Sequence, residues 1–105
     1  MPGYVIGQLQ EIKNQDAFAA YQRAAGPSVL QYGGKLVIDS AKLRPADGGW
    51  SPHRVVMLEF ESVEQAQKWY DSPEYQAVIG QRFSSADSAV LIIDGDEFHN
   101  PDPFK

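Results

Sequence analysis

The sequence predicts an α+β domain whose elements follow the order strand, helix, strand, strand, helix, strand. Four short segments rich in β-branched and aromatic residues predict the strands. Between them, apolar residues recur every three or four positions, which is typical of helices packed on one side. Glycine, proline and short polar residues separate these segments. The length of 105 residues suits one domain, for which we expect residues 1–95, followed by a C-terminal tail of residues 96–105.

The first strand is predicted at residues 4–9, and the first helix begins after Asn14, a suitable N-cap. The inner face of this helix is marked by Phe18, Tyr21, Ala25, Val29 and Tyr32. Gly26-Pro27 falls inside the helix, and proline removes one helical hydrogen bond, so we expect a kink or two shorter helices. Gly33-Gly34 ends the segment, because glycine tolerates the left-handed conformation.

The second strand is predicted at residues 35–43, followed by a turn-rich hairpin loop at residues 45–52. Residues 53–60 form the third and most apolar strand, which we place centrally in the sheet. Ser62 and Gln65 have capping-box spacing and open the second helix. The inner face of that helix is predicted to carry Val63, Ala66 and Tyr70.

The stretch WYDSPEY, residues 69–75, predicts a helix stop followed by a new start. Ser72 serves as N-cap and Pro73 occupies the first helical position, where its missing N–H does no harm. A fresh apolar stripe follows, made of Tyr75, Val78, Ile79 and Phe83. Arg82 lies inside this stripe and is predicted to point inward. Residues 88–94 form the fourth strand.

This order is the ferredoxin-like β-α-β-β-α-β arrangement, a four-stranded antiparallel sheet with helices on one face. Alternation in the third strand places Val56 and Leu58 on one face and Val55 and Met57 on the other. Both faces are therefore apolar, although the helices can cover only one. We expect a second copy of the chain to cover the other face, which predicts a homodimer packed sheet against sheet.

Composition excludes several classes of function. The net charge of −5 and the scattered basic residues make nucleic acid a poor partner. No apolar run is long enough for a membrane helix and the N-terminus has no signal-peptide pattern, so we expect no membrane contact and a cytoplasmic protein. With no cysteine and only two histidines, His53 and His99, no metal-ligand spacing exists, and no cofactor is predicted.

Three segments resemble a known family: YGGKL, HRVVMLEFESVEQAQKWYDSPEYQAVIGQR and SAVLIID. They are similar to the bacterial family catalogued as domain of unknown function 1330, over about residues 4–95. The resemblance implies a dimeric α+β barrel, in which two ferredoxin-like protomers pack through their sheets. The wider superfamily includes cofactor-independent monooxygenases, haem-degrading enzymes and small lactone isomerases. The family itself has no established reaction, so the resemblance predicts the fold and leaves the reaction open.

Arg82 is the sharpest candidate for a functional residue, because a guanidinium on an inward face needs a partner. One interpretation is a clamp for the carboxylate or enolate oxygen of a ligand. The structural alternative is an ion pair with Glu59 or Asp39, or a side chain that extends past the apolar stripe to water.

Aromatic residues supply the other candidate ligand contacts. Tyr32, Tyr70 and Tyr75 either form the walls of a ligand cleft or pack in the core. Trp69 is one position off the inner stripe and is predicted to line a groove or a dimer edge. His53 is the candidate general base, with a solvated histidine at a strand end as its alternative.

Two hypotheses about function remain open from the sequence. The first is a small homodimer that binds an aromatic or carboxylated metabolite in a cleft between helices and sheet. As an enzyme it would be a cofactor-independent oxygenase or isomerase. The second is a non-catalytic dimerisation or interaction module whose aromatic residues all serve the core. Whether the protein is an enzyme is left open.

Overall fold

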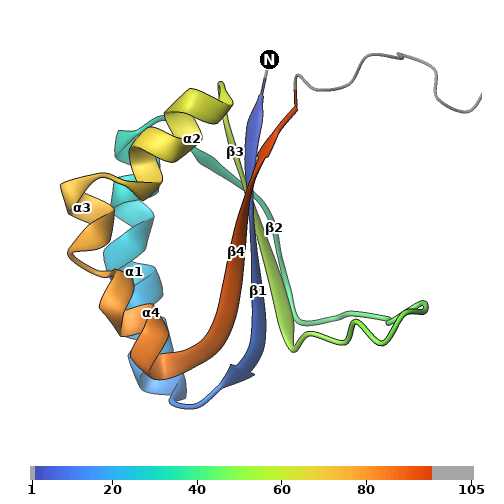
Figure 1. Cartoon of the computed structure of the whole chain (residues 1–105). Coiled ribbons are helices and arrows are strands. Elements are labelled where there is room, and N and C mark those ends of the chain that lie inside the picture. The colour runs from blue at the N-terminus through green and yellow to red at the C-terminus, as the bar shows by residue number, and fades with distance from the viewer. Residues whose placement is uncertain (1, 96–105) are drawn as a thin grey trace, which may run out of the picture.

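The computed structural model describes residues 2–95. A four-stranded antiparallel sheet of order β2-β3-β1-β4 carries its helices on one face (Figure 1), which confirms the ferredoxin-like α+β prediction. The elements are β1 (Gly3–Ile12), α1 (Gln15–Gln31), β2 (Lys35–Ser40), β3 (Arg54–Phe60), α2 (Val63–Tyr70), α3 (Pro73–Gln76), α4 (Ile79–Ser85) and β4 (Ala86–Asp94). The third strand is central, as predicted. The tail of residues 96–105, including His99, lies outside the described residues.

Helix α1 begins as predicted, with the Asn14 Oδ1 accepting a hydrogen bond from the Ala17 N–H at 3.0 Å. The expectation of two shorter helices is wrong, because α1 is one helix of 17 residues with Pro27 inside it. Pro27 leaves the carbonyl of Arg23 without its helical donor, and both residues are exposed, so water can replace the missing bond. Gly33, with a φ of 80°, ends the helix as predicted.

The second helical segment also begins as predicted. Ser62 Oγ accepts from the Gln65 N–H at 3.0 Å, but the Gln65 side chain does not complete a capping box. Its Nε2 instead donates to the Tyr32 carbonyl at 2.8 Å, which ties the start of α2 to the end of α1. Ser72 Oγ accepts from the Tyr75 N–H at 3.1 Å with Pro73 in the first turn, so the predicted restart is confirmed.

The stripe predicted after Pro73 is wrong at its far end. Helix α3 ends at Gln76 and α4 begins at Ile79, so the two helices do not share one continuous face. This interruption turns Phe83 outward, where it is 58% exposed. Arg82 and Ser85 are the residues of α4 that are buried. The inward position of Arg82 is therefore confirmed, although its apolar neighbour in the sequence is at the surface.

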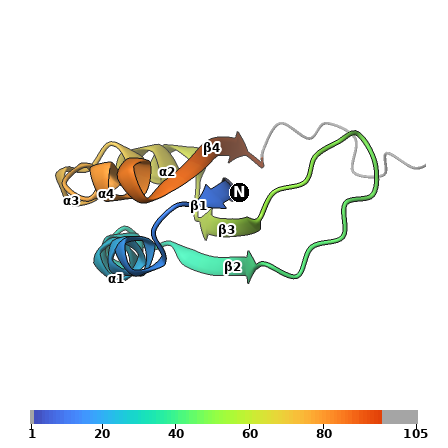
Figure 2. The ribbon, with the colours of Figure 1, turned by 90° about the horizontal axis from the view of Figure 1, so that it is seen from below.

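The two strands beside the long loop are shorter than predicted. Strand β2 ends at Ser40, where the Ser40 Oγ accepts from the Lys42 N–H at 3.0 Å and so replaces a strand hydrogen bond with a local turn. Residues 41–53 form an exposed loop that extends from the sheet on the side away from the helices (Figures 1 and 2). His53 belongs to this loop, and β3 begins at Arg54.

The sheet has two distinct apolar faces, as the alternation predicted. On the helix-facing side, Val5 pairs with Leu58 in β3 and with Ile92 in β4. These side chains meet the helices in a core that contains Phe60, Ala66, Trp69 and Tyr75. The opposite face exposes large apolar side chains: Ile38, Leu91 and Ile93. The helices therefore leave one apolar side of the sheet uncovered.

Candidate functional site

A cavity of about 730 Å³ lies between the helices and the covered face of the sheet. Its walls come from α1, from residues of all four strands, most of which face the helices, and from single residues of α2, α3 and α4. Most of the lining is apolar, including Val5, Leu9, Phe18, Val56, Leu58 and Val90. A volume of this size is within the range of small-molecule sites, roughly 300–1,000 Å³.

Arg82 reaches this cavity from α4 and is only 5% exposed. Its Nε has no hydrogen-bond partner within residues 2–95. The Cζ atom lies 5.0 Å from the centroid of the Phe83 ring, a cation–π contact.

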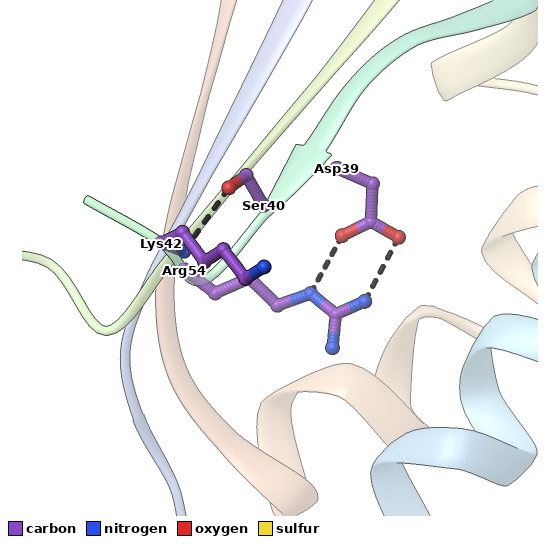
Figure 3. A network of polar contacts seen from close by, with 4 residues as sticks. All are labelled: Asp39, Ser40, Lys42 and Arg54. Atoms are coloured by element: carbon purple, nitrogen blue, oxygen red, sulfur yellow. Dashed lines mark hydrogen bonds and ion pairs between the residues drawn. The ribbon is translucent and has the colours of Figure 1, made fainter.

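The two carboxylates considered as partners for Arg82 are both engaged elsewhere. Glu59 pairs with Lys35 at 3.1 Å on the sheet face away from the helices. Asp39 receives two hydrogen bonds from Arg54, at 2.6 and 2.8 Å, and Figure 3 shows the guanidinium and carboxylate facing each other as a fork. These bonds raise the pKa of Arg54. Neither carboxylate therefore neutralises Arg82.

A pair of tyrosine hydroxyls lies in the same cavity. Tyr21 from α1 and Tyr75 from α3 are joined by a hydrogen bond of 2.8 Å between their hydroxyl oxygens. Burial raises the pKa of both phenols, whereas the positive charge of Arg82 acts to lower it. Both groups therefore remain neutral and able to donate a hydrogen bond at physiological pH.

Tyr21 and Ser88 were not among the predicted site residues. Tyr21 was visible on the inner stripe of its helix, but nothing in the sequence showed that it would meet Tyr75, 54 positions away. Ser88 lies on the helix-facing side of β4, and its buried Oγ has no partner in the described part of the chain. Period-two alternation with Val90 and Ile92 was the signal that could have placed it there.

Trp69 lines the cavity and is 3% exposed. Its ring centroid lies 5.6 Å from that of Phe60 and 4.2 Å from that of Tyr75, and its Nε1 donates to the Ser28 Oγ at 3.0 Å. The predicted inner face of α2 is therefore corrected, because Trp69 rather than Tyr70 is the buried ring. The spacing of three from Ala66 aims Trp69 directly at the sheet, while Tyr70 is half-buried beside it.

The remaining predicted site residues lie away from the cavity. The Tyr32 hydroxyl donates to the Glu74 carboxylate at 2.8 Å, and this bond raises the pKa of Tyr32. It links the end of α1 to α3. Tyr70 packs on Tyr75, with ring centroids 5.5 Å apart, and is not part of the lining. His53 is exposed in the loop before β3, so the structure does not bring it to Arg82.

Within residues 2–95, no helix combines the length and the apolar character that a membrane crossing requires. Over the same part of the chain, no group of three or more His, Cys, Asp or Glu side chains is arranged to hold a metal ion. The polar residues that line the cavity are Gln8, Tyr21, Gln22, Arg23, Asp39, Tyr75, Arg82 and Ser88.

The model of the family described as domain of unknown function (DUF1330) matches residues 2–96. No curated protein matches the chain.

Three solved structures illustrate the likeness in fold. A protein of unknown function from Rhodopseudomonas palustris is 22% identical, with a TM-score of 0.67 over 92% of this chain and 84% of that one. A dimeric ferredoxin-like protein of unknown function from Thermobifida fusca is 14% identical, with a TM-score of 0.63 over 90% and 91%. A cofactor-independent oxygenase from Streptomyces nogalater is 9% identical, with a TM-score of 0.65 over 92% and 95%. Identities this low show a shared fold and no more.

Proposed function

Since the chain belongs to the family described as domain of unknown function (DUF1330), whose description assigns no reaction, we propose a function from the cavity itself. The protein binds a small aromatic or carboxylated metabolite between helices and sheet, with Arg82 as the anion anchor. One observation carries this proposal: Arg82 lines the cavity, is 5% exposed and forms no ion pair with a carboxylate among the described residues. A ligand anion would supply the partner that a buried cation requires.

In this proposal the aromatic residues have different roles, depending on whether they line the cavity. Trp69 and Tyr75 form an aromatic wall, and Tyr21 adds a second hydroxyl beside Tyr75. Tyr32 and Tyr70 support that wall from outside the cavity by their contacts with α3. His53 has no role in this proposal, because it does not line the cavity.

If the bound metabolite reacts, the available chemistry is stabilisation of an oxyanion by Arg82 and proton transfer at a tyrosine hydroxyl. Oxygenation or isomerisation without a cofactor would suit these groups. The oxygenase from Streptomyces nogalater lends this class some support, because it has the same fold. A filled core without a cavity would favour the alternative function, a non-catalytic interaction module. The cavity and its unpaired polar atoms weigh against that alternative.

A thermal-shift screen of aromatic carboxylic acids tests the binding function. A ligand at about 100 times its Kd stabilises the folded state by about 2.7 kcal/mol. For a domain of this size we therefore expect at least one acid to raise the melting temperature by about 10 °C or more. The matched control is Arg82→Met, which keeps an unbranched apolar stem and should show no shift with the same acid. A screen without any stabilising aromatic compound would contradict the proposal.

We also propose that two copies associate through the exposed sheet face, where Ile38, Leu91 and Ile93 lie. The description of the Thermobifida fusca structure as dimeric supports this. Equilibrium sedimentation at micromolar concentration should give about twice the mass of one chain. Leu91→Asp places a charge in the apolar face and should give the mass of one chain. Leu30→Asp is the control, because Leu30 is 73% exposed on α1, outside the sheet, and this variant should still associate. A wild-type protein of monomer mass would rule out the association.

A further inference from the structure

Arg82 and a pair of tyrosine hydroxyls supply hydrogen-bond donors at the cavity wall. Arg82 lines the cavity and forms no ion pair with a carboxylate within residues 2–95. The Tyr21 and Tyr75 hydroxyls have two protons between them and form one mutual bond, so one proton is left to donate. A ligand group that fits these donors must be rich in acceptors. A carboxylate has two oxygens and no proton to place against them.

The charges around the cavity balance a ligand with one negative charge. Arg82 is a buried cation without a carboxylate partner among the described residues. Asp39 also lines the cavity, but Arg54 neutralises it. Arg23 lines it from an exposed position, where water screens its charge. One buried positive charge remains, so a dianion would leave a negative charge uncompensated in an apolar site.

The lining of the cavity indicates the rest of the ligand. Trp69 and Tyr75 lie at its inner wall with ring centroids 4.2 Å apart, and they are 3% and 1% exposed. Val56, Leu58 and Val90 add apolar groups from the sheet. An apolar ligand body needs no hydrogen-bond partners against such walls. The polar end and the apolar end of the ligand are thus recognised by different parts of the cavity.

We propose that the cavity accepts a monocarboxylate with an apolar body, whose carboxylate is held by the Arg82 guanidinium and by the unshared hydroxyl proton of the Tyr21–Tyr75 pair. This inference rests on the proposed function and narrows it to one class of ligand. It also makes Tyr21 and Tyr75 specificity-determining residues. A neutral amide of the same shape places its own N–H donors against the donors of Arg82 and the tyrosine pair, and it leaves Arg82 without a counter-charge. The amide should therefore bind poorly.

Isothermal titration with 2-naphthoate, 2-naphthamide and naphthalene-2,3-dicarboxylate tests this class. We expect wild-type protein to bind 2-naphthoate at least tenfold more tightly than either of the other two. The double variant Tyr21→Phe/Tyr75→Phe should weaken 2-naphthoate about tenfold and leave 2-naphthamide nearly unchanged, because it removes both hydroxyls and with them the charge-assisted bond. The control is Tyr32→Phe, which removes a hydroxyl bonded to Glu74 outside the cavity and should not change the affinity for 2-naphthoate.

The outcomes separate this inference from the broader proposal. Equal affinity for 2-naphthoate and 2-naphthamide would overturn the monoanion class and would leave a metabolite-binding cavity in place. Tighter binding of the dicarboxylate would overturn the charge argument. Failure of all three compounds to bind would also overturn the inference, and the wider screen would then decide the proposed function. Arg82→Met serves as a second variant should a tyrosine variant fail to fold, and it should abolish the preference for acid over amide.

Discussion

Arg82→Met is expected to make the protein more stable and to remove its affinity for anionic ligands. The substitution removes a buried charge whose Nε has no partner within residues 2–95 and replaces it with an apolar chain of similar length. Replacing buried ionic groups with apolar ones of similar volume is often stabilising by about 1 to 4 kcal/mol. The contact with Phe83 that is lost contributes less, about 0.5 to 1 kcal/mol. Urea unfolding followed by tryptophan fluorescence measures the change.

Arg54→Met is the matched control for this prediction, because it applies the same substitution to an arginine that has a partner. It breaks the two-bond pair with Asp39 and leaves a partly buried carboxylate without its cation. We expect a loss of about 1 kcal/mol, since the pair is partly accessible to water. The two arginines should therefore give changes of opposite sign. A loss of stability in Arg82→Met as large as that in Arg54→Met would show that Arg82 has a structural role.

The inward position of Arg82 could be predicted from the sequence, but the residues around it could not. The apolar spacing from Tyr75 predicted an inward Arg82, and the structure buries it within α4 although α3 and α4 do not share one continuous face. Which carboxylates lie nearby depends on strand register. The pairing of Asp39 with Val56 and of Lys35 with Glu59 places the two carboxylates on opposite faces of the sheet. Each then meets a cation on a neighbouring strand, Arg54 or Lys35.

The fold could be predicted more fully than the site because its signals are local. Ser62 and Ser72 each accept a hydrogen bond from an N–H three residues later, and a sequence shows that spacing directly. Gly33 adopts the left-handed conformation that glycine favours. The alternative of two shorter helices at Pro27 was wrong, because tolerance of a helical proline depends on whether the freed carbonyl faces water.

The hydroxyl pair of the cavity could not be predicted from local signals. Tyr21 and Tyr75 meet because of the position of α1 relative to α3. That position depends on how several side chains fill the space between the two helices. The choice between Trp69 and Tyr70 as the buried ring has a similar origin. Helical spacings of three and four from Ala66 both face inward, and only the packing against Phe60 and Ser28 selects Trp69.

Trp69→Ala is expected to produce the largest loss of stability of any single substitution considered, about 3 to 5 kcal/mol. The indole is 3% exposed and packs between Phe60 and Tyr75, so its removal enlarges the existing cavity with little chance of collapse. The substitution also removes the hydrogen bond that the Trp69 Nε1 donates to the Ser28 Oγ. Chemical unfolding followed by far-ultraviolet circular dichroism measures the change, since it does not depend on tryptophan emission.

Two companion variants divide this loss into its causes. Trp69→Phe keeps an aromatic ring on Phe60 and loses the bond to Ser28, so it should retain more than half of the stability that Trp69→Ala loses. Trp50→Ala removes an indole that is 61% exposed and should change stability by less than about 1 kcal/mol. Equal losses from Trp69→Ala and Trp50→Ala would mean that the Trp69 wall is not part of the cooperative core. A ligand could then change the shape of the cavity at little cost in stability. The wall would in that case not be rigid enough to select one class of ligand over another.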